Sequence, residues 1–202
     1  MKKLVFGTAV AAIAACFTFA AGADLPRKAP ELAFTVPGQG EKLLSQYRGK
    51  VVALEFILTT CPHCQAASRV MSNFQREYGP RGFQALDVAI NATDENRTPE
   101  QAGQLVQNFT NQFQVAFPVG YTPRDQMTTF MGFSLADRFV VPQLILIDRK
   151  GLIHYQTPPL GDEHSTEEAV IRQRIEELLS LPNSAAAHVS GKTRIAAVKK
   201  PS

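Results

Sequence analysis

Cys61 and Cys64 are the two side chains of this sequence best suited to reactive chemistry, and only Pro62 and His63 separate them. They follow the apolar run 51–58, which is typical of a buried strand, and precede a stretch with helical periodicity. At the start of a helix, unpaired N–H groups and the positive end of the dipole stabilise a thiolate, the reactive form of cysteine. The second thiol would lie one turn later, close enough to attack a mixed disulfide on the first. The pattern predicts thiol–disulfide exchange, with Cys61 as nucleophile and Cys64 as resolving thiol.

A structural disulfide and a metal site are the alternatives for this cysteine pair. A disulfide that closes a loop of two residues removes little conformational entropy from the unfolded chain, so it would stabilise the fold weakly. The third cysteine, Cys16, lies in an N-terminal segment with the pattern of a secretory signal. Export favours disulfide chemistry over a zinc site. We therefore interpret Cys61 and Cys64 as a redox pair.

Two side chains close to the cysteines in sequence are candidates for supporting roles. His63 lies between them, where a protonated or hydrogen-bonding imidazole favours the thiolate of Cys61; the alternative is a histidine that points to water. Glu55 interrupts the apolar run, where burial would raise the pKa of its carboxyl and let it shuttle the proton of Cys64. The alternative for Glu55 is an outward-facing position.

The first 23 residues have the pattern of a bacterial-type secretory signal. A basic start precedes the apolar run 4–21, and Ala21-Gly22-Ala23 matches a small-x-small cleavage site. We expect a mature chain that begins at Asp24 and lies outside the cytoplasm, in the periplasm. Two alternatives give the same location with an N-terminal membrane attachment: a lipoprotein modified at Cys16, and an uncleaved anchor, for which the run is long enough.

Basic residues are concentrated at the two ends of the chain. The net charge is +3, yet without Lys2, Lys3 and the four cations of residues 183–202 the acidic residues outnumber the basic ones. The basic pI of 8.8 is therefore no argument for nucleic-acid binding. The composition of residues 183–202 cannot build a core, and we expect a disordered basic tail.

Residues 24–182 are long enough for one domain with its own core. Apolar and alternating runs predict strands, and apolar residues at helical spacing predict helices. The expected strands are 32–36, 51–58, 83–90, 117–119, 144–147 and 153–156; the expected helices are 65–78, 98–114, 126–132 and a last one that begins at Thr166, with 41–47 as a short helical or turn segment. This order predicts an α/β fold with a mixed sheet flanked by helices.

Three features resemble the thioredoxin fold, and within it the exported TlpA/ResA-like redoxins. The first is Cys-x-x-Cys between a strand and a helix, preceded by a lysine-containing lead-in at 47–52. The second is Val141-Pro142 in front of the hairpin, and the third is an extra β/α stretch between Phe83 and Phe139. The resemblance implies a thioredoxin-like domain with an N-terminal extension and a central β/α insertion.

The resemblance also implies roles for individual residues. Pro142 matches the cis-proline that this fold keeps opposite the cysteines, and the backbone of Val141 would pair with a substrate strand there, next to Pro62. An acid at the strand position of Glu55 would be buried beneath the cysteines. No cofactor is implied, because the dithiol itself carries two electrons. The implied partners are cysteine-containing exported proteins and a membrane redox protein.

The direction of electron flow stays open. A TlpA-like body implies a reductant, as in cytochrome c maturation. The active-site dipeptide Pro62-His63 is similar to that of the DsbA oxidases, as is Leu54-Glu55-Phe56 upstream, and this implies an oxidant that forms disulfide bonds in folding proteins.

Two other functions compete with disulfide exchange. A copper chaperone similar to the Sco proteins would use the two cysteines as soft Cu(I) ligands, with His164 as a conceivable third. A peroxiredoxin-like thiol peroxidase would use Cys61 against peroxide. His154, His164 and His188 have no partner that the sequence identifies, so structural or solvent-exposed roles are expected for them.

Overall fold

The computed structural model describes residues 25–134, 136–162, 164 and 167–182. The predicted signal segment 1–23 with Cys16, the predicted tail 183–202 with His188, and the predicted helix start at Thr166 lie outside the described residues. Within the described ranges, no helix is both long and apolar enough to cross a membrane.

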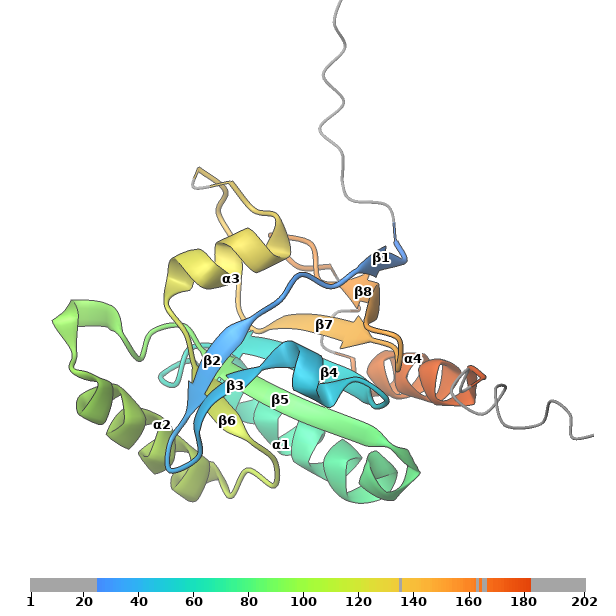
Figure 1. Cartoon of the computed structure of the whole chain (residues 1–202), viewed down its shortest axis with the longest axis horizontal. Coiled ribbons are helices and arrows are strands. Elements are labelled where there is room, and N and C mark those ends of the chain that lie inside the picture. Colours follow the sequence, from blue (N-terminus) through green and yellow to red (C-terminus); the bar gives the residue numbers. More distant parts are fainter. Residues whose placement is uncertain (1–24, 135, 163, 165–166, 183–202) are drawn as a thin grey trace, which may run out of the picture.

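A mixed sheet forms the centre of the molecule (Figure 1). Its strands are β1 (Arg27–Lys28), β2 (Ala33–Val36), β3 (Gly40–Leu43), β4 (Val51–Ile57), β5 (Phe83–Ala89), β6 (Val119–Tyr121), β7 (Gln143–Ile147) and β8 (Leu152–Gln156). The order across the sheet is β1-β8-β7-β4-β5-β6-β2-β3. Strands β4, β5 and β6 are parallel, whereas β7 runs antiparallel to β4 and forms the hairpin with β8. The two longest strands, β4 and β5, are therefore central and are buried along their whole length.

In the described part of the chain, four α-helices cover the sheet: α1 (Pro62–Tyr78), α2 (Pro99–Phe113), α3 (Arg124–Met131) and α4 (Glu168–Ser180). Short 3-10 turns occupy Leu44–Tyr47, Gly79–Arg81 and Asp94–Asn96. The start of α2 is set by Thr98, whose hydroxyl accepts a hydrogen bond from the backbone N–H of Gln101 while the Gln101 side chain accepts one from the N–H of Thr98. Proline follows the N-cap residue in both α1 and α2, where its missing N–H is not needed.

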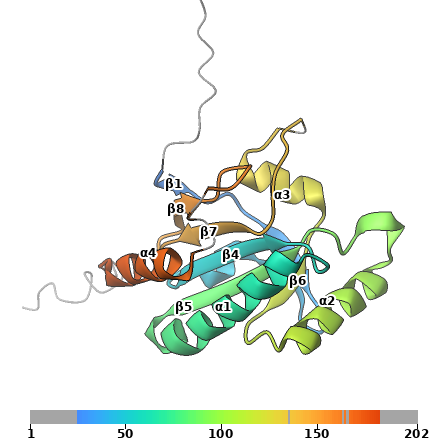
Figure 2. The same cartoon turned by 180° about the vertical axis from the view of Figure 1, so that it is seen from behind.

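The two faces of the sheet bury different cores. Helix α3 lies on one face, where it packs with the even-numbered side chains of β4 in one apolar cluster. Helices α1, α2 and α4 lie on the other face, seen in front of the sheet in Figure 2. Their apolar side chains form two separate clusters, one between α1 and α4 and one between α1 and α2.

The expected fold class is confirmed, and the differences from the expected elements are local. Residues 41–47 begin as strand β3 rather than as a helical or turn segment, because Gly38 and Gly40 take positive φ and reverse the chain onto β2. Strand β6 starts at Val119, two residues later than expected, since Pro118 has no N–H to donate to a ladder. In α4, Ala169 is exposed and does not face the core.

Candidate functional site

The two cysteines occupy the N-terminus of α1 with different exposure. Cys61 is the N-cap residue, and its carbonyl accepts a hydrogen bond from the N–H of Gln65 at 3.0 Å. Cys64 lies one turn later on the inner side of the helix and is fully buried, whereas Cys61 is partly exposed. Both are free thiols. A reagent can therefore approach Cys61 directly, whereas Cys64 is shielded from solvent.

Burial raises the pKa of the Cys64 thiol well above its ordinary value, and the nearby Cys61 and Glu55 raise it further. The thiol is consequently neutral in this environment. Before Cys64 can act as a nucleophile, a group beside it must accept its proton.

Glu55 lies on β4 beneath this helix and is 2% exposed, so it is not an outward-facing residue. Its in-register partner on the parallel strand β5 is Asp87, which is 0% exposed. Burial raises the pKa of both carboxyls, and the charge of Asp87 raises the pKa of Glu55 further. The site thus contains two buried acids in contact.

A serine connects this acid pair to the helix that carries the cysteines. Ser68 is buried on α1, one turn after Cys64. Its Oγ lies 2.5 Å from Asp87 Oδ2 and 3.0 Å from the Cys64 carbonyl oxygen. The hydroxyl has one proton, and the shorter contact indicates that it donates to the carboxylate of Asp87.

The residues between and opposite the cysteines lie at the surface of the site. Pro62 and His63 are exposed in the first turn of α1. The Val141–Pro142 peptide bond is cis. Val141 is half-buried and packs, like Cys61, against the apolar cluster that contains Cys64. The chain before β7 and the partly exposed thiol therefore contact the same apolar cluster.

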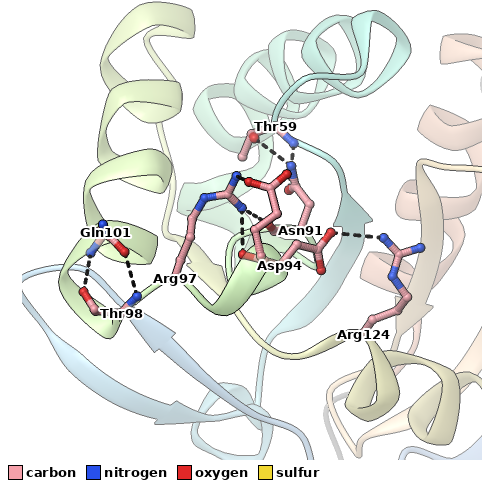
Figure 3. Close-up of polar contacts among 8 residues, drawn as sticks. Thr59, Asn91, Asp94, Arg97, Thr98, Gln101 and Arg124 are labelled. Atoms are coloured by element: carbon pink, nitrogen blue, oxygen red, sulfur yellow. Dashed lines mark hydrogen bonds and ion pairs between the residues drawn. The ribbon is translucent and has the colours of Figure 1, made fainter.

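The loop in front of Cys61 is fixed to the loop that follows β5 (Figure 3). Asn91 Oδ1 accepts from the N–H of Thr59 and Asn91 Nδ2 donates to Thr59 Oγ1, both at 3.1 Å. Arg97 Nη1 donates to the carbonyl oxygens of Asn91 and Asp94, at 3.0 and 3.1 Å. The first cysteine therefore sits on a loop that is held from the outside by a polar network.

The histidines that lacked a partner in the sequence have one in the structure. His154 Nε2 lies 3.0 Å from Asp148 Oδ2, and His164 Nδ1 lies 2.9 Å from Glu167 Oε1. Each histidine thus lies beside a carboxylate away from the cysteines, in a contact that fits the expected structural or solvent-exposed role. In the part of the chain that the structure describes, no group of three or more His, Cys, Asp and Glu side chains could hold a metal ion.

Asp87 and Ser68 are the site residues that sequence reasoning missed. The apolar pattern of 83–90 predicts only a core strand, although Asp87 interrupts it as Glu55 interrupts the range 51–58. A single acid inside each of two neighbouring buried strands was the available signal. Their pairing depends on the register between β4 and β5, which the sequence does not display.

Comparison with solved structures supports the fold. The crystal structure of a Chlorobium tepidum protein assigned as the thiol:disulfide interchange protein DsbE is 27% identical, with a TM-score of 0.62 over 77% of this chain and 98% of that one. The solution structure of a Bacteroides thetaiotaomicron protein assigned as a protein disulfide isomerase is 22% identical, with a TM-score of 0.59 over 82% of this chain and 96% of that one. At this identity the second likeness concerns the fold alone.

Sequence comparisons give a family and one partial relative. A Xenopus laevis protein assigned as glutathione peroxidase 8-A is 32% identical over 78 residues, which are 38% of this chain and 36% of that protein. The chain thus matches about a third of the length of that curated relative. The redoxin family model matches residues 26–172, well over half of the chain. The chain belongs to the redoxin family and has the thioredoxin-like fold of thiol-based oxidoreductases.

Proposed function

We propose that this protein is an exported thiol–disulfide oxidoreductase that exchanges disulfides with cysteine-containing proteins through Cys61 and Cys64. The observation that carries the proposal is the contrast between the two thiols: one partly exposed at the N-cap of α1, the other fully buried one turn later. This arrangement suits a substrate that bonds to the outer sulfur and is released by the inner one.

In the reducing direction, the Cys61 thiolate attacks one sulfur of a substrate disulfide. A new S–S bond forms between Cys61 and the substrate, and the substrate's second sulfur leaves as a thiolate. Cys64 then loses its proton and attacks Cys61, which breaks the mixed disulfide and releases the other substrate thiolate. The protein ends as the Cys61–Cys64 disulfide and the substrate gains two electrons. Every step is reversible, so the same site oxidises a substrate dithiol when the protein starts as the disulfide.

The surrounding residues have supporting roles in this proposal. His63, exposed next to Cys61, stabilises the thiolate and so favours the reduced form of the pair. Glu55 accepts the proton of Cys64. The backbone at Val141 and Pro142, together with Pro62, receives the substrate segment that flanks its reacting cysteine.

Export is part of the proposal and rests on the signal pattern of residues 1–23. In the periplasm, a membrane redox protein would recharge the pair after each turnover. Such a protein would supply electrons if this chain acts as a reductant in cytochrome c maturation, and remove them if it acts in disulfide bond formation. The N-terminal segment is cleaved after Ala23, cleaved and lipidated at Cys16, or retained as a membrane anchor.

Trapping of the mixed disulfide tests the proposal. The Cys64→Ser variant is incubated with a denatured protein that contains one disulfide, and non-reducing electrophoresis with mass spectrometry identifies the adduct. We expect a covalent complex through Cys61 that dithiothreitol dissolves, and none with Cys61→Ser. Wild-type protein should turn over without accumulating it. Absence of both the complex and turnover at neutral pH contradicts the proposal.

Thiol peroxidase activity is a second candidate, favoured by the partial match to glutathione peroxidase 8-A. In that reaction the Cys61 thiolate takes an oxygen atom from peroxide to become a sulfenic acid, and Cys64 condenses with it to give the disulfide and water. Single-turnover oxidation with hydrogen peroxide separates the two candidates. A rate for Cys61 far above that of a free thiolate supports the peroxidase, and an equal rate leaves disulfide exchange.

A further inference from the structure

Glu55 and Asp87 form a carboxyl pair between the two apolar clusters of the α1 face. Both project from central strands toward α1, and burial is nearly complete for each. They lie in register on neighbouring parallel strands, close enough for the charge of Asp87 to raise the pKa of Glu55. Two buried carboxylates side by side resist being ionised together, because each charge disfavours the other. The pair therefore holds one proton and one negative charge.

The charges around the pair do not neutralise it. Across the described ranges, neither carboxyl forms an ion pair with lysine, arginine or histidine. The titratable groups that face the pair from α1 are Cys64 and, above it, Cys61. The hydroxyl of Ser68 binds Asp87 from the same helix. The pair is thus anionic, and the proton donors in its surroundings are this hydroxyl and the thiols.

The pair also has spare acceptor atoms. Glu55 Oε2 and Asp87 Oδ1 are buried and have no hydrogen-bond partner among the described residues. Buried polar atoms without a partner cost stability, and they are rare where a residue serves packing alone. The same-face neighbours of Asp87 on β5 are Ala85 and Ala89, so a small apolar residue would fit the pattern of the strand. The sequence instead has a second acid, Asp87, beneath the resolving thiol.

We propose that Asp87 is a positioning residue that shares a proton with Glu55, so that the two carboxyls act as a single proton store for Cys64. The inference rests on the proposed exchange reaction. When Cys64 attacks the Cys61–substrate disulfide, its proton moves to Glu55, and the proton already shared shifts onto Asp87. The Cys64–Cys61 bond forms, the Cys61–substrate bond breaks, the substrate leaves as a thiolate, and the pair changes from one proton to two. In the reverse reaction the pair returns that proton to Cys64.

A two-step thiol titration separates this role from the rest of the reaction. The fully reduced protein is mixed with an aromatic disulfide reagent that releases a coloured thiol. Attack by Cys61 releases the first equivalent, and attack by Cys64 on the adduct releases the second. With Asp87→Asn we expect the second release to slow by about a hundredfold at neutral pH, the typical contribution of acid–base catalysis, and the first to change by less than about twofold. The midpoint of the pH profile of the second release should move to lower pH, because the charge of Asp87 no longer raises the pKa of Glu55.

Three further variants complete the test. Glu55→Gln should show the same defect, and the double variant Glu55→Gln with Asp87→Asn should be no slower than either single one, since the residues act as one unit. Ser68→Ala should slow the second release in the same direction and serves as the readout if Asp87→Asn does not fold. Asp125→Asn, an exposed carboxyl at the start of α3, is the matched control and should behave as wild type.

The possible results distinguish the two proposals. A wild-type protein that never releases the second equivalent contradicts the exchange function itself. A normal second release in both Asp87→Asn and Ser68→Ala, with an unchanged pH midpoint, overturns the role of Asp87 and leaves the exchange function intact. Additive defects in the double variant also overturn the shared proton store.

Discussion

The two faces of strands β4 and β5 bury different kinds of side chain. On the α3 face, Val52, Leu54 and Phe56 join Leu86 and Val88 in one unbroken apolar cluster. On the α1 face, the same strands place Glu55 and Asp87 between two apolar clusters. Successive side chains of a strand point to opposite faces of the sheet, so neighbouring residues in the sequence belong to the two different faces.

This difference between the two faces suggests that the α3 face serves stability and that the acids on the α1 face serve reactivity. Burying apolar surface stabilises the fold by about 25 cal/mol per Å², whereas burying a carboxyl opposes folding unless it is fully paired. The α3 face gains this stabilisation at each of the five apolar positions named above. The α1 face loses part of this stabilisation beneath the cysteines, because two carboxyls occupy positions that apolar side chains could fill. Proton transfer at this position would need such ionisable groups. We therefore expect changes on the α3 face to affect folding and changes on the α1 face to affect reactivity.

Removing the outer thiol should have the largest effect on reactivity. We expect Cys61→Ser to lose all measurable disulfide exchange, because Cys64 is fully buried and cannot meet a substrate directly. Its unfolding free energy should change by less than about 1 kcal/mol, since the partly exposed side chain caps no helix N–H. Insulin reduction and urea denaturation measure the two quantities. Residual exchange above a few per cent would mean that another thiol reacts with the substrate.

Phe56→Ala should show the opposite behaviour. Phe56 is 0% exposed on the α3 face and lies edge-on to Phe130 at 5.7 Å between ring centroids. Truncation should cost about 3–5 kcal/mol of unfolding free energy, a large share of the 5–15 kcal/mol typical of a domain. The exchange rate per folded molecule should stay near the wild-type value. A mild loss of stability combined with a large loss of exchange would contradict the separation between the faces.

The carboxyl pair should make stability depend on pH in a specific sense. Burial, and for Glu55 the charge of Asp87, raises the folded-state pKa of both acids above the unfolded values. Their stabilising contribution is therefore complete below pH about 4 and is lost as the pH rises through the raised values. The loss is about 1.4 kcal/mol for each pH unit over which one proton separates the two states.

Asp87→Asn removes part of this dependence. Between acidic and mildly alkaline pH, its unfolding free energy should fall less than that of the wild type, so the variant becomes relatively more stable as the pH rises. Urea denaturation across this range measures the difference, with Asp125→Asn as the exposed control that should follow the wild type. Parallel curves for Asp87→Asn and wild type would show that the pair does not hold a proton in the folded state.

The polar network on the outer rim should contribute least. Arg124 Nη2 lies 3.4 Å from Asp94 Oδ2, and both side chains are nearly half exposed, so solvent screens their attraction (Figure 3). We expect Arg124→Ala to change the unfolding free energy by less than about 1 kcal/mol and to leave exchange unchanged. A larger loss of exchange would give the rim a role in positioning Cys61 that its exposure does not suggest.

Much of the fold could be predicted from the sequence because its signals are local. Cys61 and Cys64 between a strand and a helix, the cap at Thr98, and the Asp148–Gly151 turn of the β7–β8 hairpin each depend on a few consecutive residues. The start of the site at α1 followed from the same kind of signal. These elements have the bounds expected from the sequence to within a few residues.

The parts that could not be predicted depend on contacts between distant segments. Asp87 reads as one polar residue in a core strand until β5 pairs with β4 and sets it against Glu55. Strand β3 has little apolar pattern of its own and exists through its pairing with β2. His154 meets Asp148 across the β7–β8 turn, where only the folded hairpin brings them together.

The reduction potential of the Cys61–Cys64 couple is the measurement to make first. The protein is equilibrated against glutathione and dithiothreitol buffers, and the oxidised fraction is read by thiol alkylation and mass spectrometry. We predict one reversible two-electron couple. A potential of about −120 mV identifies a disulfide donor, and a potential of about −270 mV identifies a reductant. No reversible couple between these cysteines at any buffer potential would contradict the exchange function and direct attention to metal binding at the two thiols.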